Sequence, residues 1–257
     1  MEMNVKIGIL GAMLEEISTI KEIMTVEKET TVAGRLYSEG KINDLEVVVV
    51  FSRWGKVASA STTTTLIGLF NVDFILFTGV AGAVNANLNI GDVVIGNGLY
   101  QHDMDARPFF DQFQIPLTNT LVFEPRSADI EKAKSAAQRF INKMDTAFTT
   151  TLLEKYSIFK PKVYTGLIAS GDKFIANPGA HIDLNFSEKE RTTLAVEMEG
   201  AAVAQVCEDH QVPYIVIRTI SDKADHSAAI DFQSFIKDIA SKYSVEIVKE
   251  YITATPF

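Results

Sequence analysis

Short apolar runs alternate along the chain with longer segments whose apolar residues recur at helical spacing. The apolar runs are rich in β-branched residues, as is typical of buried strands, and cover residues 5–10, 45–51, 74–78, 91–95, 162–169, 194–199 and 212–220. Helical spacing covers residues 15–24, 58–70, 127–144, the segment after Gly200, and 232–251. This alternation predicts an α/β fold of three layers, α/β/α, with a mixed, largely parallel central sheet.

Two regions depart from the alternation. Strands at 35–39 and 45–51 flank a turn at Asn43-Asp44 and predict a β-hairpin. Residues 100–116 form an aromatic-rich loop, which favours a lid or a subunit contact over a loop packed beneath the core.

Composition restricts the classes of partner. The 257 residues are 47% hydrophobic and 22% charged, without a Pro/Gly/Ser-rich linker, so we expect one domain spanning residues 1–257. A net charge of -9 would repel phosphate backbones, so neither nucleic acid nor an anionic membrane is an expected partner.

Cysteine and histidine usage indicates a reducing compartment and no metal. Cys207 is the single cysteine, and the spacing of the four histidines is unlike that of metal ligands. The N-terminal segment does not resemble a signal peptide, and no apolar run is long enough to cross a bilayer. We therefore expect a cytoplasmic protein.

Two carboxylates follow the apolar run at 194–196. An ionised carboxylate among apolar neighbours is costly unless it is paired, neutralised or in use. If the strand stays extended, Glu197 and Glu199 share one face and Met198 takes the other. The sequence therefore indicates a carboxylate site at the strand's end, with an ion pair to Lys or Arg as the alternative.

The first strand-to-helix loop does not suit a dinucleotide. The glycines at positions 8 and 11 do not fit G-x-G-x-x-G, and Glu15 and Glu16 stand where a pyrophosphate would need amides. These acids would alternatively stabilise the helix through its dipole. We expect no cofactor.

Two further strand ends carry candidate binding features. Trp54, the only tryptophan, stands beside Gly55 after a strongly apolar strand and would form a ligand wall or a core anchor. Thr78-Gly79-Val80-Ala81-Gly82-Ala83 has two glycines after the strand at 74–78, which permits close approach of a ligand or simply a tight turn.

Together these stretches resemble the purine-type nucleoside phosphorylases and nucleosidases, most closely the 5'-methylthioadenosine/S-adenosylhomocysteine nucleosidases. The resemblance runs nearly end to end, and its carriers are Gly8-Ile9-Leu10-Gly11-Ala12-Met13 with Glu15-Glu16, Gly55-Lys56-Val57, Thr78 to Gly82, Ser170-Gly171-Asp172, Val196-Glu197-Met198-Glu199 and Ser221-Asp222-Lys223-Ala224-Asp225. It implies a nucleoside phosphorylase-like fold and a nucleoside substrate.

The resemblance also implies catalytic roles. Glu16 would activate the attacking water, Asp222 would protonate N7 of the adenine, and Glu199 with Met198 would hold the ribose hydroxyls. Breaking an N-glycosidic bond needs an acid for the leaving base, a base for water and support for oxocarbenium charge. Asp222 would then have to hold its proton near neutral pH, through burial or hydrogen bonding.

Further implied roles concern substrate binding. Phe174 would stack on the base and the Ile175 backbone would bond to it, while Arg218 would support the water. The other implied substrate-binding residues are Trp54 and Phe232 as walls of the 5' substituent, together with Val80, Ala81, Gly82, Glu197 and Ser221. Phe109 and Pro116 resemble residues that reach into the partner's site across a homodimer interface.

Substrate choice stays open at this point. Trp54 is bulkier than the expected aliphatic residue, and Val80 stands where some members carry serine. The alternatives are 6-amino-6-deoxyfutalosine as substrate, or a phosphorylase that uses phosphate as nucleophile. Glu16 favours hydrolysis over phosphorolysis, because a carboxylate repels the phosphate anion.

Overall fold

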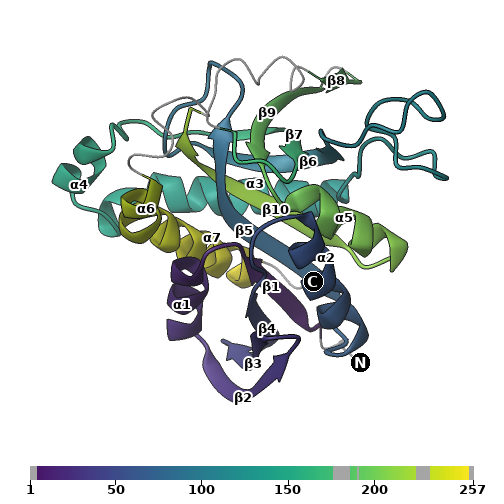
Figure 1. Cartoon of the computed structure of the whole chain (residues 1–257). Coiled ribbons are helices and arrows are strands. Elements are labelled where there is room, and N and C mark those ends of the chain that lie inside the picture. The colour runs from purple at the N-terminus through teal and green to yellow at the C-terminus, as the bar shows by residue number, and fades with distance from the viewer. Residues whose placement is uncertain (1–4, 176–185, 190, 224–231, 255–257) are drawn as a thin grey trace.

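The computed structural model describes residues 5–175, 186–189, 191–223 and 232–254. Within these residues, strands and helices alternate as the apolar pattern predicts (Figure 1). The strands are β1 (Ile7–Gly11), β2 (Thr25–Val32), β3 (Arg35–Ile42), β4 (Leu45–Phe51), β5 (Phe74–Ala83), β6 (Val93–Gln101), β7 (Val163–Ser170), β8 (Ser187–Glu188), β9 (Arg191–Glu197) and β10 (Tyr214–Asp222).

The helices lie between and after these strands. They are α1 (Leu14–Glu22), α2 (Lys56–Gly68), α3 (Ser127–Asn142), the 3-10 turn η1 (Met144–Thr146), α4 (Thr150–Lys155), α5 (Gly200–Asp209), α6 (Phe232–Phe235), the π-helical turn η3 (Ile236–Ala240) and α7 (Ser241–Thr253). The closing helix predicted over 232–251 is therefore interrupted by a π-turn. None of the helices in the described ranges is long and apolar enough to span a membrane.

The sheet is mixed, as predicted, in the order β2-β3-β4-β1-β5-β10-β6-β7-β9-β8. Pairing is parallel along β4-β1-β5-β10 and along β6-β7-β9, and antiparallel at the other pairings. The predicted hairpin is confirmed, because β3 pairs antiparallel with β4 across a turn in which Asn43 has φ 55°. β2 was not predicted. Its exposed sequence TVEKETTV carries no apolar alternation, and it is held at the sheet edge by pairing with β3.

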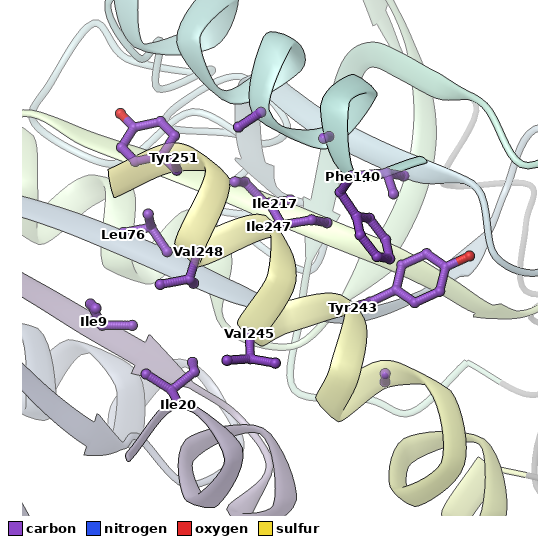
Figure 2. Packing of buried hydrophobic residues seen from close by; sticks show 14 of the residues in the cluster. Ile9, Ile20, Leu76, Phe140, Ile217, Tyr243, Val245, Ile247, Val248 and Tyr251 are labelled. Atoms are coloured by element: carbon purple, nitrogen blue, oxygen red, sulfur yellow. The ribbon is translucent and has the colours of Figure 1, made fainter. Parts of the chain in front are cut away.

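Two helical layers cover the two faces of the sheet, as expected. Side chains at alternate positions of β4 point to opposite cores: Val47 and Val49 to one, Val48 and Val50 to the other. The first core includes α1, α3 and α7, and Figure 2 shows α7 residues packed against Ile9, Leu76 and Phe140. The second core packs under α2 and α5.

Four consecutive threonines fit inside α2 because each hydroxyl donates to a carbonyl of its own helix. The bonds run from Thr62, Thr63, Thr64 and Thr65 to the carbonyl four residues earlier, at 2.8–2.9 Å. The low helix propensity of threonine is thereby offset within a helix that packs on α5.

One additional strand pairing closes part of the sheet on itself. The last residues of β5 also pair antiparallel with β9, Gly82 opposite Val196 and Ala83 opposite Ala195. Strands β5, β10, β6, β7 and β9 therefore form a closed ring. The predicted strand at 74–78 continues to Ala83, so Gly79 and Gly82 lie within β5 and the expected turn after the strand is absent from β5.

Candidate active site

A cleft opens where the loops after β1, β4 and β7 meet the ends of β5, β9 and β10. It holds about 610 Å³ of space including its opening to solvent, within the usual size of a small-molecule site. The lining residues are Ala12, Met13, Trp54, Val80, Ala81, Gly82, Lys173, Phe174, Ile175, Val196, Glu197, Met198, Glu199, Ser221, Asp222 and Phe232. Most of the residues predicted from the sequence therefore line one cleft; Glu16, Arg218, Phe109 and Pro116 do not.

Glu16 lies on the first turn of α1, three residues after the lining residue Met13, and is fully buried. Two glycines lie beside it: a Cβ on Gly11 would stand 3.4 Å from Glu16 Oε2, and one on Gly79 would stand 3.7 Å from it, both ordinary van der Waals distances.

The Glu16 carboxylate has few donors. Ser244 Oγ on α7 donates to Oε1 over 3.4 Å, and Oε2 has no hydrogen-bond partner in the described residues. Burial raises the pKa of Glu16 to about 8, against the opposing effect of the Arg218 charge. A carboxyl group with such a pKa is a fitting general base near neutral pH.

Glu197 occupies a different environment at the end of β9. It forms a buried ion pair with Arg218, whose Nη2 lies 2.6 Å and Nε 3.2 Å from Oε2. Gly200 N–H donates to both carboxylate oxygens at 2.9 Å, and Ser170 Oγ donates to Oε1. For Glu197, the ion-pair alternative considered from sequence is correct.

The expected alternation of faces at this strand end is wrong. β9 ends at Glu197, and Glu199 adopts φ -136° and ψ -38° as the chain enters α5, so extended geometry stops between the two glutamates. Glu197, Met198 and Glu199 consequently all line the cleft.

Glu199 is buried, and Gly55 N–H donates to its Oε1 at 2.8 Å. Burial, followed by the neighbouring Glu197 charge, raises the pKa of Glu199. Glu16 and Glu199 are therefore two buried carboxyl groups that resist ionisation.

A β-bulge brings two consecutive polar residues to the cleft from β10. The register against β5 shifts between Ile220 and Asp222, which lets Ser221 and Asp222 both line the cleft. Ser221 Oγ donates to Asp222 Oδ2 at 2.7 Å. Ala224 and Asp225 of the same motif lie outside the described residues.

Aromatic side chains form the outer wall. Trp54 is 57% exposed, and its Nε1–H donates to the carbonyl of Ala12 at 2.9 Å, tying the loops after β1 and β4 together. Phe174 meets Phe232 edge to face, with ring centroids 5.7 Å apart. The outer wall is thus apolar and suits a flat base or an apolar substituent.

Besides Glu16, three predicted residues do not line the cleft. Arg218 is 1% exposed, stacks 4.0 Å from the Phe77 ring centroid and does not line the cleft. Phe109 and Pro116 belong to the segment between β6 and α3, which projects from the sheet (Figure 1). Phe109 is 85% exposed, whereas Phe113 of the same segment is buried against Tyr100, so only part of this loop is free to meet a partner.

Sequence reasoning missed the residues that support these carboxylates. Ser244 reaches Glu16 from 228 positions along the chain, and Ser170 reaches Glu197 from 27. The sequence around Ser244 gives no indication of such a contact. Ser170 belongs to the stretch Ser170-Gly171-Asp172, which carries part of the family resemblance, and this stretch could have pointed to it.

The chain belongs to the Phosphorylase superfamily, whose family model matches residues 6–253. It is 38% identical over 247 residues to the 5'-methylthioadenosine/S-adenosylhomocysteine nucleosidase of Staphylococcus haemolyticus, covering 96% of this chain and 98% of that protein. It is 36% identical over 236 residues to the aminodeoxyfutalosine nucleosidase of Helicobacter pylori, covering 91% and 93%.

Among solved structures, the fold matches the S-adenosylhomocysteine nucleosidase of Streptococcus pyogenes in complex with 5-methylthiotubericidin. The TM-score is 0.83 at 34% identity, over 99% of both chains. The predicted family and fold class are thereby confirmed.

Proposed function

We propose that the protein hydrolyses the N-glycosidic bond of 5'-methylthioadenosine and S-adenosylhomocysteine, and also of 5'-deoxyadenosine. The products are adenine and the 5-substituted ribose. The observation that carries this proposal is that Glu199 and Asp222 line one cleft with apolar walls, while the buried Glu16 lies close enough to Glu199 for the two charges to interact. Nucleosidases are prominent among the relatives.

Each carboxyl group has a distinct task in this reaction. Glu16, once ionised, takes the proton of the attacking water, and its raised pKa makes it a stronger base than an exposed glutamate. Asp222, which the bulge in β10 brings to the cleft, donates a proton to the leaving adenine. Glu199 holds the ribose hydroxyls and supports positive charge on the sugar.

Water is favoured over phosphate as the nucleophile. Glu16 Oε2 has no hydrogen-bond donor among the described residues, and once Glu16 is ionised its charge would repel a phosphate dianion, whereas water carries no charge to repel. Adenine release from methylthioadenosine is therefore expected in phosphate-free buffer. An absolute requirement for phosphate would contradict the hydrolase and favour a phosphorylase.

A second substrate is 6-amino-6-deoxyfutalosine, favoured by the resemblance to the Helicobacter pylori enzyme. Incubation with methylthioadenosine, S-adenosylhomocysteine, 5'-deoxyadenosine, aminodeoxyfutalosine and inosine, ranked by release of adenine or hypoxanthine, tests both. We expect methylthioadenosine to rank first and inosine last. Highest kcat/KM for aminodeoxyfutalosine would reassign the preferred substrate.

We also propose that the active unit is a homodimer in which Phe109 closes the partner's cleft. Phe109 and Leu117 are 85% and 92% exposed on the projecting segment, so their side chains are available to a second copy of the chain. Phe109→Ala should weaken the binding of substrates with long apolar 5' groups by roughly 1–3 kcal/mol relative to the binding of adenosine. An active monomer in light scattering, or an equal effect on all substrates, would contradict this assignment.

The same proposal covers the cellular setting and the domain organisation. The buried thiol of the single cysteine, Cys207, suits a reducing cytoplasm, and adenine release from methylthioadenosine suits methionine salvage. The sheet links strands from both ends of the chain, which supports one domain over residues 1–257.

A further inference from the structure

Two carboxylates from distant segments meet the start of α2. Gly55 N–H donates to Glu199 Oε1, and the next amide, Lys56 N–H, donates to Asp172 Oδ1, both at 2.8 Å. The first amides of a helix have no partner within the helix, so acceptors for them must come from elsewhere. Here one acceptor belongs to the cleft and the other to the loop after β7.

The backbone at this position is constrained. Gly55 adopts φ 90° and ψ 160°, a conformation that side chains disfavour. A Cβ on Gly55 would also stand 3.0 Å from Asp172 Oδ1. Asp172 therefore packs directly against the glycine whose N–H holds Glu199.

Asp172 is itself held in place from a third segment. Its N–H donates to Asp103 Oδ2 at 2.9 Å, and Asp103 Oδ1 pairs with Lys56 Nζ at 2.6 Å. Lys56 Nζ also donates to Gln101 Oε1 at 3.0 Å. Lys56, Asp172 and Asp103 thus close a ring of hydrogen bonds around the start of α2.

The ring links two parts of the cleft. Lys56 of the ring follows Gly55, whose N–H holds Glu199. Asp172 of the ring directly precedes the lining segment Lys173, Phe174 and Ile175. A displacement of Asp172 would disturb the Gly55 peptide and the aromatic wall together.

We propose that Asp172 is a positioning residue that, through the Gly55-Lys56 turn, fixes the Glu199 carboxylate in the cleft, with Asp103 supporting Asp172. The kinetic part of this inference rests on the proposed nucleosidase activity. The geometric part does not, because it concerns the orientation and ionisation of Glu199 in the free protein.

The kinetic test uses Asp172→Ala and the conservative Asp172→Asn. Alanine removes the acceptor for Lys56 N–H, whereas the asparagine carbonyl keeps it. We expect Asp172→Ala to lower kcat/KM for methylthioadenosine by about tenfold to a hundredfold, as for a lost hydrogen bond to a charged group, and Asp172→Asn to restore most of it.

Asp73→Ala is the matched control, because Asp73 also accepts a backbone amide, that of Lys6 at 2.9 Å, but lies outside this network. It should leave kcat/KM at the wild-type value. If Asp172→Ala does not fold, Asp103→Ala replaces it and should impair kcat/KM in the same direction, since it removes the acceptor for the Asp172 amide. Unchanged kcat/KM in the folded variant, or equal impairment by Asp172→Ala and Asp172→Asn, overturns the proposal.

A second readout does not need turnover. The Glu199 carboxyl carbon is titrated by 13C NMR and assigned by its loss in Glu199→Gln. Burial and the Glu197 charge raise the pKa of Glu199, whereas the Gly55 hydrogen bond and the Arg218 charge lower it. Glu16 on α1 is a further carboxyl group whose charge interacts with that of Glu199. Weakening the Gly55 bond in Asp172→Ala should therefore raise the pKa of Glu199.

The two readouts separate the two proposals. A wild-type protein that releases no adenine would refute the proposed function, while an upward shift of the Glu199 titration in Asp172→Ala would still support positioning. An unshifted titration in folded Asp172→Ala overturns the positioning role whatever the activity.

Discussion

Glu16 and Glu197 are both buried carboxylates near the same cleft, yet their surroundings are opposite. Glu197 receives donors from Arg218, Ser170 and Gly200, whereas among the described residues the side-chain donor to Glu16 is Ser244 alone, over 3.4 Å. Arg218 stands near Gly79, as Glu16 does, but its guanidinium is aligned on Glu197.

The difference in donors assigns a structural role to one carboxylate and a chemical role to the other. A buried carboxylate that is surrounded by donors is stabilised as the ion and holds its neighbours in place. A buried carboxylate that lacks donors has a raised pKa and stays reactive toward protons. Glu197 therefore anchors β9 and α5 to β10, while Glu16 is left for acid–base work.

Removing Glu197 should produce the largest effect. Glu197→Ala leaves Arg218 buried without its partner and should lower the free energy of unfolding by about 3–5 kcal/mol. Denaturant unfolding measures this, with Glu131→Ala as control because the 3.8 Å pair of Glu131 with Lys134 is exposed and should contribute less than about 1 kcal/mol. Equal losses in both variants would mean that the buried ion pair is not an anchor.

Removing Glu16 should affect turnover and leave folding intact. Glu16→Gln should lower kcat/KM by roughly a hundredfold or more, and Asp222→Asn and Glu199→Gln should act similarly as losses of acid–base or charge-supporting function. Steady-state kinetics with circular dichroism as the folding check tests each variant. Near wild-type turnover in any of them would withdraw the role assigned to that residue.

Glu16 should also make stability depend on pH. Its pKa is raised from 4.5 to about 8 on folding, so the folded state holds a proton that the unfolded state releases between these values. The unfolding free energy of the wild type should therefore fall, relative to that of Glu16→Gln, by about 2–3 kcal/mol from pH 5 to pH 7, and the loss should continue to about pH 8. Parallel pH profiles for the two proteins would contradict the buried, protonated state.

The two serines give the smallest and most closely matched test. Ser170→Ala removes a donor to Glu197 and the acceptor for Ala201 N–H at 2.7 Å, whereas Ser244→Ala removes only the 3.4 Å bond to Glu16 and the acceptor for Thr78. We expect Ser170→Ala to cost about 1 kcal/mol more in unfolding free energy. The opposite order would show that Glu16 depends on its donor more than Glu197 does.

The sequence predicted the parts of this arrangement that depend on local pattern. β-branched runs located the strands, helical spacing located α1, α3 and α7, and the acids at strand ends pointed to the cleft. These features are readable because burial imposes a period of two or 3.6 on neighbouring residues.

What could not be predicted depends on contacts between distant segments. The pairing of β5 with β9 closes the strand ring. The chain leaves extended geometry after Glu197 to enter α5, which is why the expectation for Met198 failed. The edge strand β2 lacks an apolar face, and it is held by backbone pairing with β3 and by side-chain bonds of Glu29 to Lys21 and Ser38. Tertiary packing likewise decides that Arg218 forms its ion pair with Glu197 and not with Glu16.

The position of β10 in the sheet has a consequence for synthesis of the chain. β10 is the last strand in the sequence, yet it lies between β5 and β6 and pairs with both. A ribosome-bound chain that stops before Tyr214 would hold β5 and β6 without the neighbour they share, leaving backbone donors and acceptors open in the middle of the sheet. Assembly of the centre thus waits until synthesis has passed β10, and Asp222 enters the cleft with the strand that completes it.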